Sequence, residues 1–421
     1  MAAAFAAGVL ASASIASADD GACLRVTRSN VVRCAEDASL AVRGQKLDVE
    51  VANARRTAVS PLLPSNPVVS VMAARRGVSN GATNSTNWSA TLSQELEIAG
   101  QRGLRREAAA HEITAQQQRT VATERDVAAE ALVAYFDAVA AAEVVRLAVR
   151  LETTGKNVAV VTRARADSGV ASPLEADVAE STALALARAR LAADRGAQAA
   201  RIELSTLLGQ DPATTVAEVD GELVPLAGAD AIARAAVARV AEQPEVQALE
   251  AERRSLATQA AALRRARIPN PTLQVFVQND GFDERVYGGG VSLPIPLPYP
   301  LGRTNKGEIA EAEARSARVA TDAERQRREI QRRLALAART FESRRVEVAA
   351  FTPERVIRAE RLLGDIATEI GGGRLAVRDA VIGQQALIEL LRGYIEARRA
   401  LCVASVELSR AAGISIERGG R

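Results

Sequence analysis

The sequence predicts a mainly α-helical protein with a small β part, built from two tandem repeats of a β-hairpin followed by a long helical hairpin. Three observations lead to this prediction. The two halves of the chain match at one constant offset, short stretches of alternating polarity precede very long stretches with a helical period, and aromatic residues make up only 3% of the chain. Few bulky side chains disfavour a large globular core and favour helices that pack closely along their length.

The internal repeat is the most informative feature, because three short motifs recur at the same separation in the sequence. They are an Asn-Pro pair, a glycine near the end of a long helical stretch, and a Glu-Leu-Ser triplet followed by a glycine. The chain is therefore predicted to be a tandem duplication. The matching pairs are Asn66-Pro67 with Asn270-Pro271, Gly169 with Gly373, and residues 203–209 with 407–413, all 204 positions apart.

Each repeat is predicted to contain a β-hairpin, at residues 67–96 and at residues 271–295. In the first, Trp88, Ala90 and Leu92 alternate with polar residues after a polar turn, and the second repeats the same alternation. A period of two with one apolar and one polar face, over about eight to ten residues, is typical of membrane-barrel strands. Four such strands are too few to close a barrel.

A long helical hairpin is predicted to follow each β-hairpin, at residues 104–209 and 305–413. Apolar and small residues recur there every three or four positions, as in a coiled coil. The outgoing helix of each hairpin is expected to run unbroken to a glycine that can adopt positive φ. The other predicted segments are an N-terminal segment and helix at 19–66, a linker or equatorial segment at 210–230, a helix at 231–268 and a tail at 414–421.

The N-terminus predicts export. Residues 1–18 are apolar and rich in alanine, and they end in small residues before Asp19, which is typical of a signal peptide, although no Lys or Arg precedes the apolar run. No later run approaches the roughly 20 apolar residues of a membrane-spanning helix. Cys23 and Cys34 are interpreted either as two small thiols or as a local disulfide, and Cys402 is too distant to be their obvious partner. The residues before Cys23 lack the apolar position of a lipoprotein signal.

Composition argues against several functions. Lys and Arg number 54 and Asp and Glu 51, so the net charge is only +3 and no basic field for nucleic acid is expected. One His and three scattered Cys do not suffice for a Cys/His zinc site, a haem site or a catalytic triad. No catalytic residue, cofactor-binding residue or metal ligand is therefore predicted, and the chain is not expected to be an enzyme.

The pattern resembles the outer-membrane efflux protein family, the TolC-like channels of tripartite exporters. The resemblance rests on the duplicated order of elements, on Asn66-Pro67 and residues 268–271 before the hairpins, and on residues 92–97 leading into residues 100–102. That last stretch is similar to the heavy-metal cation branch, as in cobalt-zinc-cadmium exporters. The resemblance implies a homotrimer whose chains contribute four strands each to a 12-stranded outer-membrane β-barrel, which a periplasmic α-barrel continues.

The resemblance also implies a function and its residues. The protein would be a passive exit duct in outer-membrane lipid, driven by an inner-membrane pump through a periplasmic adaptor protein. The ends of the helical hairpins would form the gate and contact the adaptor, and an ion pair of Glu175 with Arg374 across neighbouring hairpins would hold the gate closed. The implied gate and adaptor-contact residues are Gly169, Glu175, Asp177, Gly373, Arg374, Arg378 and Asp379. Trp88, whose strand places it near the polar loop, and Tyr287 are expected in the membrane-interface belt of the barrel, and a packing role within the hairpin is the alternative for Trp88.

Two alternatives without a pore remain. A periplasmic adaptor also uses long helical hairpins, but it needs one hairpin flanked by lipoyl-like β segments, whereas this chain has two hairpins. A periplasmic coiled-coil scaffold explains the helices and the alanine content, but it gives no reason for amphipathic strands placed symmetrically before them.

Overall fold

A computed structural model describes residues 23–76, 85–211, 213, 216–235, 240–279, 284–297, 301–302 and 304–414. The predicted signal peptide, the turns of the two β-hairpins and nearly all of the predicted tail lie outside the described residues. The elements, in chain order, are β1 (Arg25–Val26), α1 (Val31–Ala38), α2 (Leu40–Ala58), β2 (Val68–Arg76), β3 (Ser85–Glu95), α3 (Gln101–Asp167), α4 (Pro173–Leu207), β4 (Glu218–Val219), α5 (Ala229–Ala235), α6 (Pro244–Arg265), β5 (Thr272–Asn279), β6 (Arg285–Ser292), α7 (Lys306–Ala349), α8 (Pro353–Gly371) and α9 (Val377–Ala411).

The chain folds into two compact units. The sheet unit comprises Ala41–Thr123 and Val237–Arg333, and the hairpin unit comprises Met1–Leu40, Glu124–Ala236 and Leu334–Arg421. Helices α3 and α7 each contribute their N-terminal part to the sheet unit and the rest to the hairpin unit.

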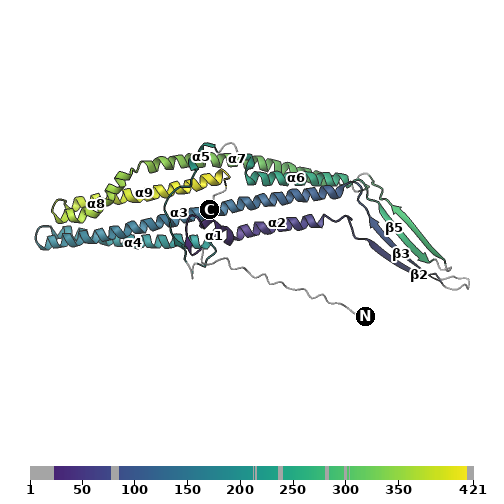
Figure 1. Ribbon diagram of the computed structural model, residues 1–421, viewed down its shortest axis with the longest axis horizontal. Helices are drawn as coiled ribbons and strands as arrows, with labels where there is room; N and C mark the ends of the chain where they lie inside the picture. Colours follow the sequence, from purple (N-terminus) through teal and green to yellow (C-terminus); the bar gives the residue numbers. More distant parts are fainter. Residues whose placement is uncertain are drawn as a thin grey trace. The chain divides into compact units, whose positions relative to one another are not determined.

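The sheet unit contains one four-stranded antiparallel sheet in the order β2-β3-β5-β6 (Figure 1). The register places Trp88 of β3 opposite Ala73 of β2 and Asn279 of β5. Helices α2 and α6 and the first parts of α3 and α7 complete the unit. A buried hydrogen bond joins two of these helices. The Ser255 hydroxyl of α6 donates to the Ala108 carbonyl of α3 at 2.9 Å.

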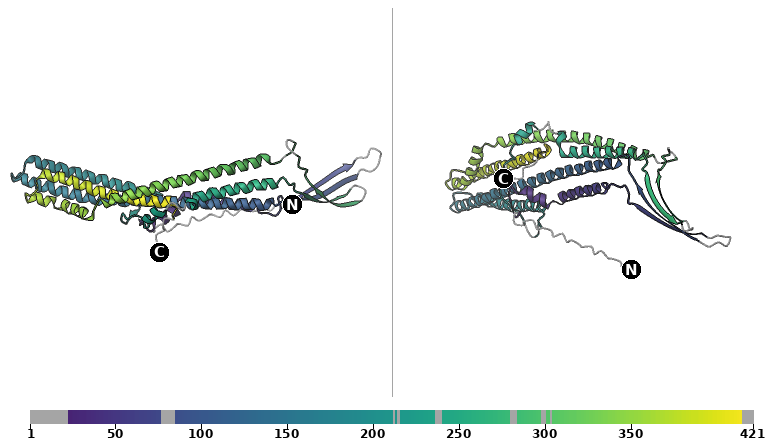
Figure 2. Two further views of the ribbon diagram at one scale, coloured as in Figure 1. Left: turned by 90° about the horizontal axis from the view of Figure 1, so that it is seen from above. Right: turned by 45° about the vertical axis from the view of Figure 1, so that its right-hand side comes forward.

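The hairpin unit has a core made mostly of alanine, leucine and valine, as the scarcity of aromatic residues predicts. Tyr135 and Phe136 of α3 are its largest fully buried side chains, and their ring centroids lie 5.4 Å apart. Buried side chains of α3, α4, α8 and α9 pack in one core, in which α9 lies close to α4 and α8 runs beside α9 (Figure 2). Ion pairs add to this packing, because Arg399 and Arg410 of α9 bind Asp137 and Asp126 of α3.

The duplication predicted from the sequence is visible in the helix bounds. Adding the offset of 204 to the first and last residues of α4 gives 377 and 411, which are the bounds of α9. The same offset takes the start of α2 to the start of α6, and the end of α3 to the end of α8. The two halves of the chain therefore fold as repeats of one design.

Two predicted helices are broken at prolines. The helix expected at 231–268 is α5 followed by α6, which starts at Pro244, and the outgoing helix of the second hairpin ends at Ala349 and resumes as α8 at Pro353. Gln243 and Thr352, the residues before these prolines, have extended backbone with ψ of 135° and 139°. Proline disfavours helical conformation in the preceding residue and cannot donate to the helical hydrogen-bond ladder, so each of the two prolines begins a new helix.

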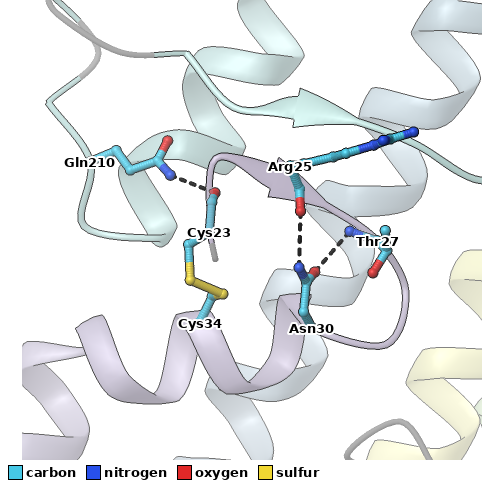
Figure 3. Close-up of a disulfide and its surroundings, with 6 residues drawn as sticks. All are labelled: Cys23, Arg25, Thr27, Asn30, Cys34 and Gln210. Atoms are coloured by element: carbon cyan, nitrogen blue, oxygen red, sulfur yellow. Dashed lines mark hydrogen bonds between the residues drawn. A yellow bond between two sulfur atoms is a disulfide. The ribbon is translucent and has the colours of Figure 1, made fainter. Parts of the chain in front are cut away.

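The N-terminal segment is fastened to the segment between the repeats. β1 pairs in parallel with β4, and Cys23 forms a disulfide with Cys34 of α1 (Figure 3). The Gln210 side chain donates to the Cys23 carbonyl at 2.7 Å, which ties the end of the first repeat to the same segment. Of the two interpretations that the sequence left open, the local disulfide is the one observed, and Cys402 is buried and free.

Candidate functional site

The turns at the ends of the two helical hairpins have the same backbone design. Gly169 and Gly373 have φ of +73° and +71°, which L residues with a side chain rarely adopt. The residue after each glycine donates its N–H to a carbonyl of the last helical turn, so that Val170 bonds Arg165 and Arg374 bonds Glu369. This Schellman arrangement satisfies carbonyls that the end of a helix leaves without a partner, and it makes both turns tight.

In the first hairpin, one arginine holds the two helices together beside the turn. Arg163 of α3 donates to Asp177 at 3.0 Å and to Glu180 at 2.7 Å, both on α4. The hydrogen bond to Glu180 and then that to Asp177 raise the pKa of the Arg163 guanidinium. Asp177, one of the predicted gate residues, is therefore engaged within its own hairpin.

The structure links the two hairpin ends through Arg165. Its guanidinium, on the last turn of α3, donates to the Ile370 carbonyl at the C-terminus of α8. A cation is favoured at this position because the C-terminal end of a helix carries a partial negative charge and unpaired carbonyls. Arg165 was not among the predicted site residues, because its partner is a backbone carbonyl of another helix.

The structure gives Glu175 and Arg374 separate partners within the chain. Glu175 accepts the Ser172 N–H at 2.9 Å and completes a capping box at the start of α4, with Ser172 as the N-cap. Arg374 binds Glu369 through two hydrogen bonds of 2.7 and 2.8 Å, and these bonds lower the pKa of the Glu369 carboxyl. The predicted pairing of Glu175 with Arg374 across hairpins concerns neighbouring hairpins, and within one chain both residues have these other roles.

The other predicted gate residues lie at the start of α9. Arg378 and Asp379 are exposed in its first turn, whereas Val377 and Ala380 on the same turn are buried. An acid in the first turn complements the positive end of the helix dipole. The surface of this hairpin end therefore carries Arg374, Arg378 and Asp379 together.

The sheet has one apolar and one polar face. Val71, Ala90, Val277 and Tyr287 lie opposite one another in the register of the four strands and share the apolar face. Val275 and Val291 lie an even number of residues away along β5 and β6, so they project to the same face. The opposite face, called the polar face, is richer in polar residues, with serine, threonine and glutamine side chains, but it also carries Val68, Met72, Phe276 and Val286. The predicted belt residues Trp88 and Tyr287 both lie on the apolar face near the hairpin turns, and both are exposed.

The motif that resembles the heavy-metal branch has a structural role at the junction between the sheet and the helices. Asn270, from the second Asn-Pro pair, donates to Glu95 at the end of β3 at 2.7 Å and accepts from Gln101 at the start of α3 at 3.0 Å. Arg102 donates to the carbonyl of Ser60 after α2 at 2.6 Å. The motif residues therefore fix the path of the chain from strand to helix.

Within the part of the chain that the structure describes, no cluster of three or more His, Cys, Asp or Glu residues is arranged to hold a metal ion. The described helices include none that is both long and apolar enough to cross a membrane.

Comparisons with known proteins agree with this geometry. Residues 35–210 match the model of the family described as outer membrane efflux protein. The fold is similar to the outer-membrane channel OprN (18% identity, TM-score 0.70, 93% of this chain and 89% of that one) and to CusC (15%, 0.73, 94% and 94%). It is also similar to the MtrE outer membrane channel of Neisseria gonorrhoeae in its open state (17%, 0.69, 93% and 89%). A search of curated proteins found no match.

The chain therefore has the fold of the outer-membrane efflux channels, mainly helical with a small sheet and two tandem repeats. The family model covers the part of this fold that runs from α1 to the end of α4.

Proposed function

We propose that this protein is the outer-membrane duct of a tripartite efflux system and that it works as a homotrimer. An inner-membrane pump would supply the energy through a periplasmic adaptor protein. The chain itself would provide a passive, water-filled exit path and make or break no bond.

The two-faced sheet is the observation that carries this proposal. Strands β2 and β6 are its edges, so each presents one side of its backbone for further pairing. Three copies with four strands each give twelve strands, which is enough for a closed barrel without edges. In such a barrel the apolar face contacts outer-membrane lipid, with Trp88 and Tyr287 at the interface, and the polar face lines the lumen.

The hairpin ends are the proposed gate and adaptor surface. Their glycine turns and the Arg165 contact make each end compact, while Arg374, Arg378 and Asp379 are exposed and available to a partner. In a trimer, Arg374 of one hairpin and Glu175 of the next would pair to hold the closed state. One exposed pair contributes only about 0.2 to 1 kcal/mol, but three-fold repetition adds these contributions.

Heavy-metal cations are the proposed cargo, on the resemblance of residues 92–102 to that branch. Residues 92–102 connect a strand to a helix and bind no metal in this proposal. Selectivity for metal ions would therefore come from the pump and the adaptor and not from this chain. Removal of the protein from its host should increase sensitivity to cobalt, zinc and cadmium ions. Equal sensitisation to organic toxicants would contradict a metal-specific role.

Mass and conductance test the proposed duct directly. The protein extracted from the envelope with detergent should have a protein mass near three times 44.3 kDa, less any leader peptide. Purified protein in planar bilayers should form ion-conducting channels. A water-soluble species that forms no channels would favour the periplasmic scaffold or adaptor instead.

The gate pair can be tested with charge variants. Arg374→Glu combined with Glu175→Gln should increase leakage through the closed channel, and the glutamine keeps an oxygen for the capping box. Arg361→Glu is the matched control, because it makes the same charge change at an exposed position of α8 outside the predicted gate residues. Unchanged leakage in the double variant would remove this pair from the gate.

A further inference from the structure

The polar face of the sheet carries one aromatic residue among its described positions, Phe276 of β5. Its register neighbours are Thr91 of β3 and Gly288 of β6. The other residues that β5 projects to this face are Thr272, Gln274 and Gln278, all polar. A phenyl ring on such a face needs an explanation, because in a water-filled lumen it would expose its apolar surface.

The ring leans across the neighbouring strand onto Gly288. A Cβ added to Gly288 would overlap the ring's Cζ atom and lie 2.5 Å from Cε1 and 3.1 Å from Cε2. The far end of the ring therefore occupies the space that any side chain at position 288 would take. This is the pairing in which an aromatic residue covers a cross-strand glycine.

Other glycines of the same strand do not have this contact. A Cβ on Gly290, which projects to the same face two residues further along β6, would meet no atom within 4 Å. A Cβ on Gly289 would meet the Gln274 carbonyl oxygen at 3.4 Å, which is ordinary packing. A side chain at position 288 would therefore displace the ring of Phe276, whereas one at position 290 would meet no neighbouring atom.

We propose that Gly288 sets the width of the duct by letting Phe276 lie flat against the barrel wall. This inference rests on the proposed function, since the polar face is a lumen only in the barrel. With a side chain at position 288 the ring would have to leave the wall, and the free direction is away from the sheet. Three rings, one from each copy, would then narrow the lumen at one level.

Polymer exclusion measures this width apart from the gate. Polyethylene glycols of graded size are added only on the side of the barrel opening, and those that enter the lumen reduce the single-channel conductance. Gly288→Ala should shift the size limit to smaller polymers, and Gly290→Ala, the matched control, should leave it unchanged. Gly288→Ala combined with Phe276→Ala should restore the wild-type limit. An unchanged limit in Gly288→Ala would overturn the proposal.

Phe276→Ala alone tests the same idea without crowding the wall. If the ring lies flat, its removal should leave the size limit close to the wild-type value. A clear shift to larger polymers would mean that the ring already projects into the lumen, and the proposal would be wrong. Absence of any channel in the wild-type protein would instead contradict the proposed function.

Discussion

Gly221 has no room for a side chain, because a Cβ there would overlap the hydroxyl oxygen of Tyr135. Tyr135 is fully buried on α3, and its hydroxyl donates to the Asp220 carbonyl at 3.0 Å. This close approach joins the segment after β4 to the core of the hairpin unit. A single residue thus links the connection between the repeats to the longest helix.

Gly221→Ala should lower the free energy of unfolding by about 1 to 3 kcal/mol, the usual cost of overpacking a filled site. Chemical denaturation in detergent, followed by circular dichroism, measures this change. Gly44→Ala serves as the control, because Gly44 is exposed in α2 with open space around it. It should stabilise the helix by roughly 0.5 to 1 kcal/mol. Equal effects of the two substitutions would contradict the packing explanation.

Cys402 should make the hairpin unit sensitive to alkali. Burial raises the pKa of its thiol from 9.0 to about 12, so the folded state keeps the proton when the unfolded chain has lost it. The stabilisation is complete below the unfolded pKa and is lost as the pH rises toward the folded value. The free energy of unfolding should therefore fall between about pH 9 and about pH 12.

Cys402→Ala removes the group that titrates and should reduce this dependence. Comparison of denaturation curves for both proteins from about pH 8 to about pH 11 measures the slope. Tyr135, whose pKa burial also raises, contributes in the same direction and remains in the variant, so some slope should persist. Identical slopes would mean that the thiol is more accessible than its buried position indicates.

At the scale of the secondary-structure elements, α3 and α8 end in the same way. Each is followed by a glycine with positive φ that allows the turn to the next helix. Gly169→Ala and Gly373→Ala should each destabilise the hairpin unit by about 1 kcal/mol or somewhat more, because alanine is strained at positive φ. Gly372→Ala, one residue away with φ of −74°, is the matched control and should cost little. Thermal unfolding of the three variants provides the comparison.

The sequence predicted most elements, because hydrophobic period and glycine position are local properties. The ends of α4 and α9 follow from the repeat, and the strands follow from alternating polarity. The breaks before Pro244 and Pro353 were missed, although the proline rule was available, since the helical period continues on both sides of each break. Arg165 was missed for another reason. Its partner is a backbone carbonyl of another helix, which leaves no trace in the local pattern.

At the scale of the whole molecule, the N-terminal segment is bound to the segment between the two repeats within the hairpin unit. β1 pairs with β4, which lies between the two repeats, so the segment around Arg25 and Val26 is held by the middle of the chain. Arg25 binds Asp220 at 2.6 Å beside that pairing, and Asn30 donates to the Arg25 carbonyl at 2.9 Å. Spacing alone did not decide whether Cys23 and Cys34 pair, because that depends on how this segment folds back onto α1.

The disulfide between Cys23 and Cys34 should therefore stabilise the segments that it joins in the hairpin unit. Closing a loop of about a dozen residues lowers the conformational entropy of the unfolded chain. In the chain-entropy description this raises the free energy of unfolding by about 3 kcal/mol. Cys23→Ala combined with Cys34→Ala should lose about that amount, and amide hydrogen exchange should accelerate in β1, α1 and β4 while β2 and β3 keep their protection. Reductant should reproduce these changes in the wild-type protein and have no effect on the variant. If amide hydrogen exchange also accelerated throughout the sheet unit, the disulfide would stabilise the whole chain and not only the segments that it joins.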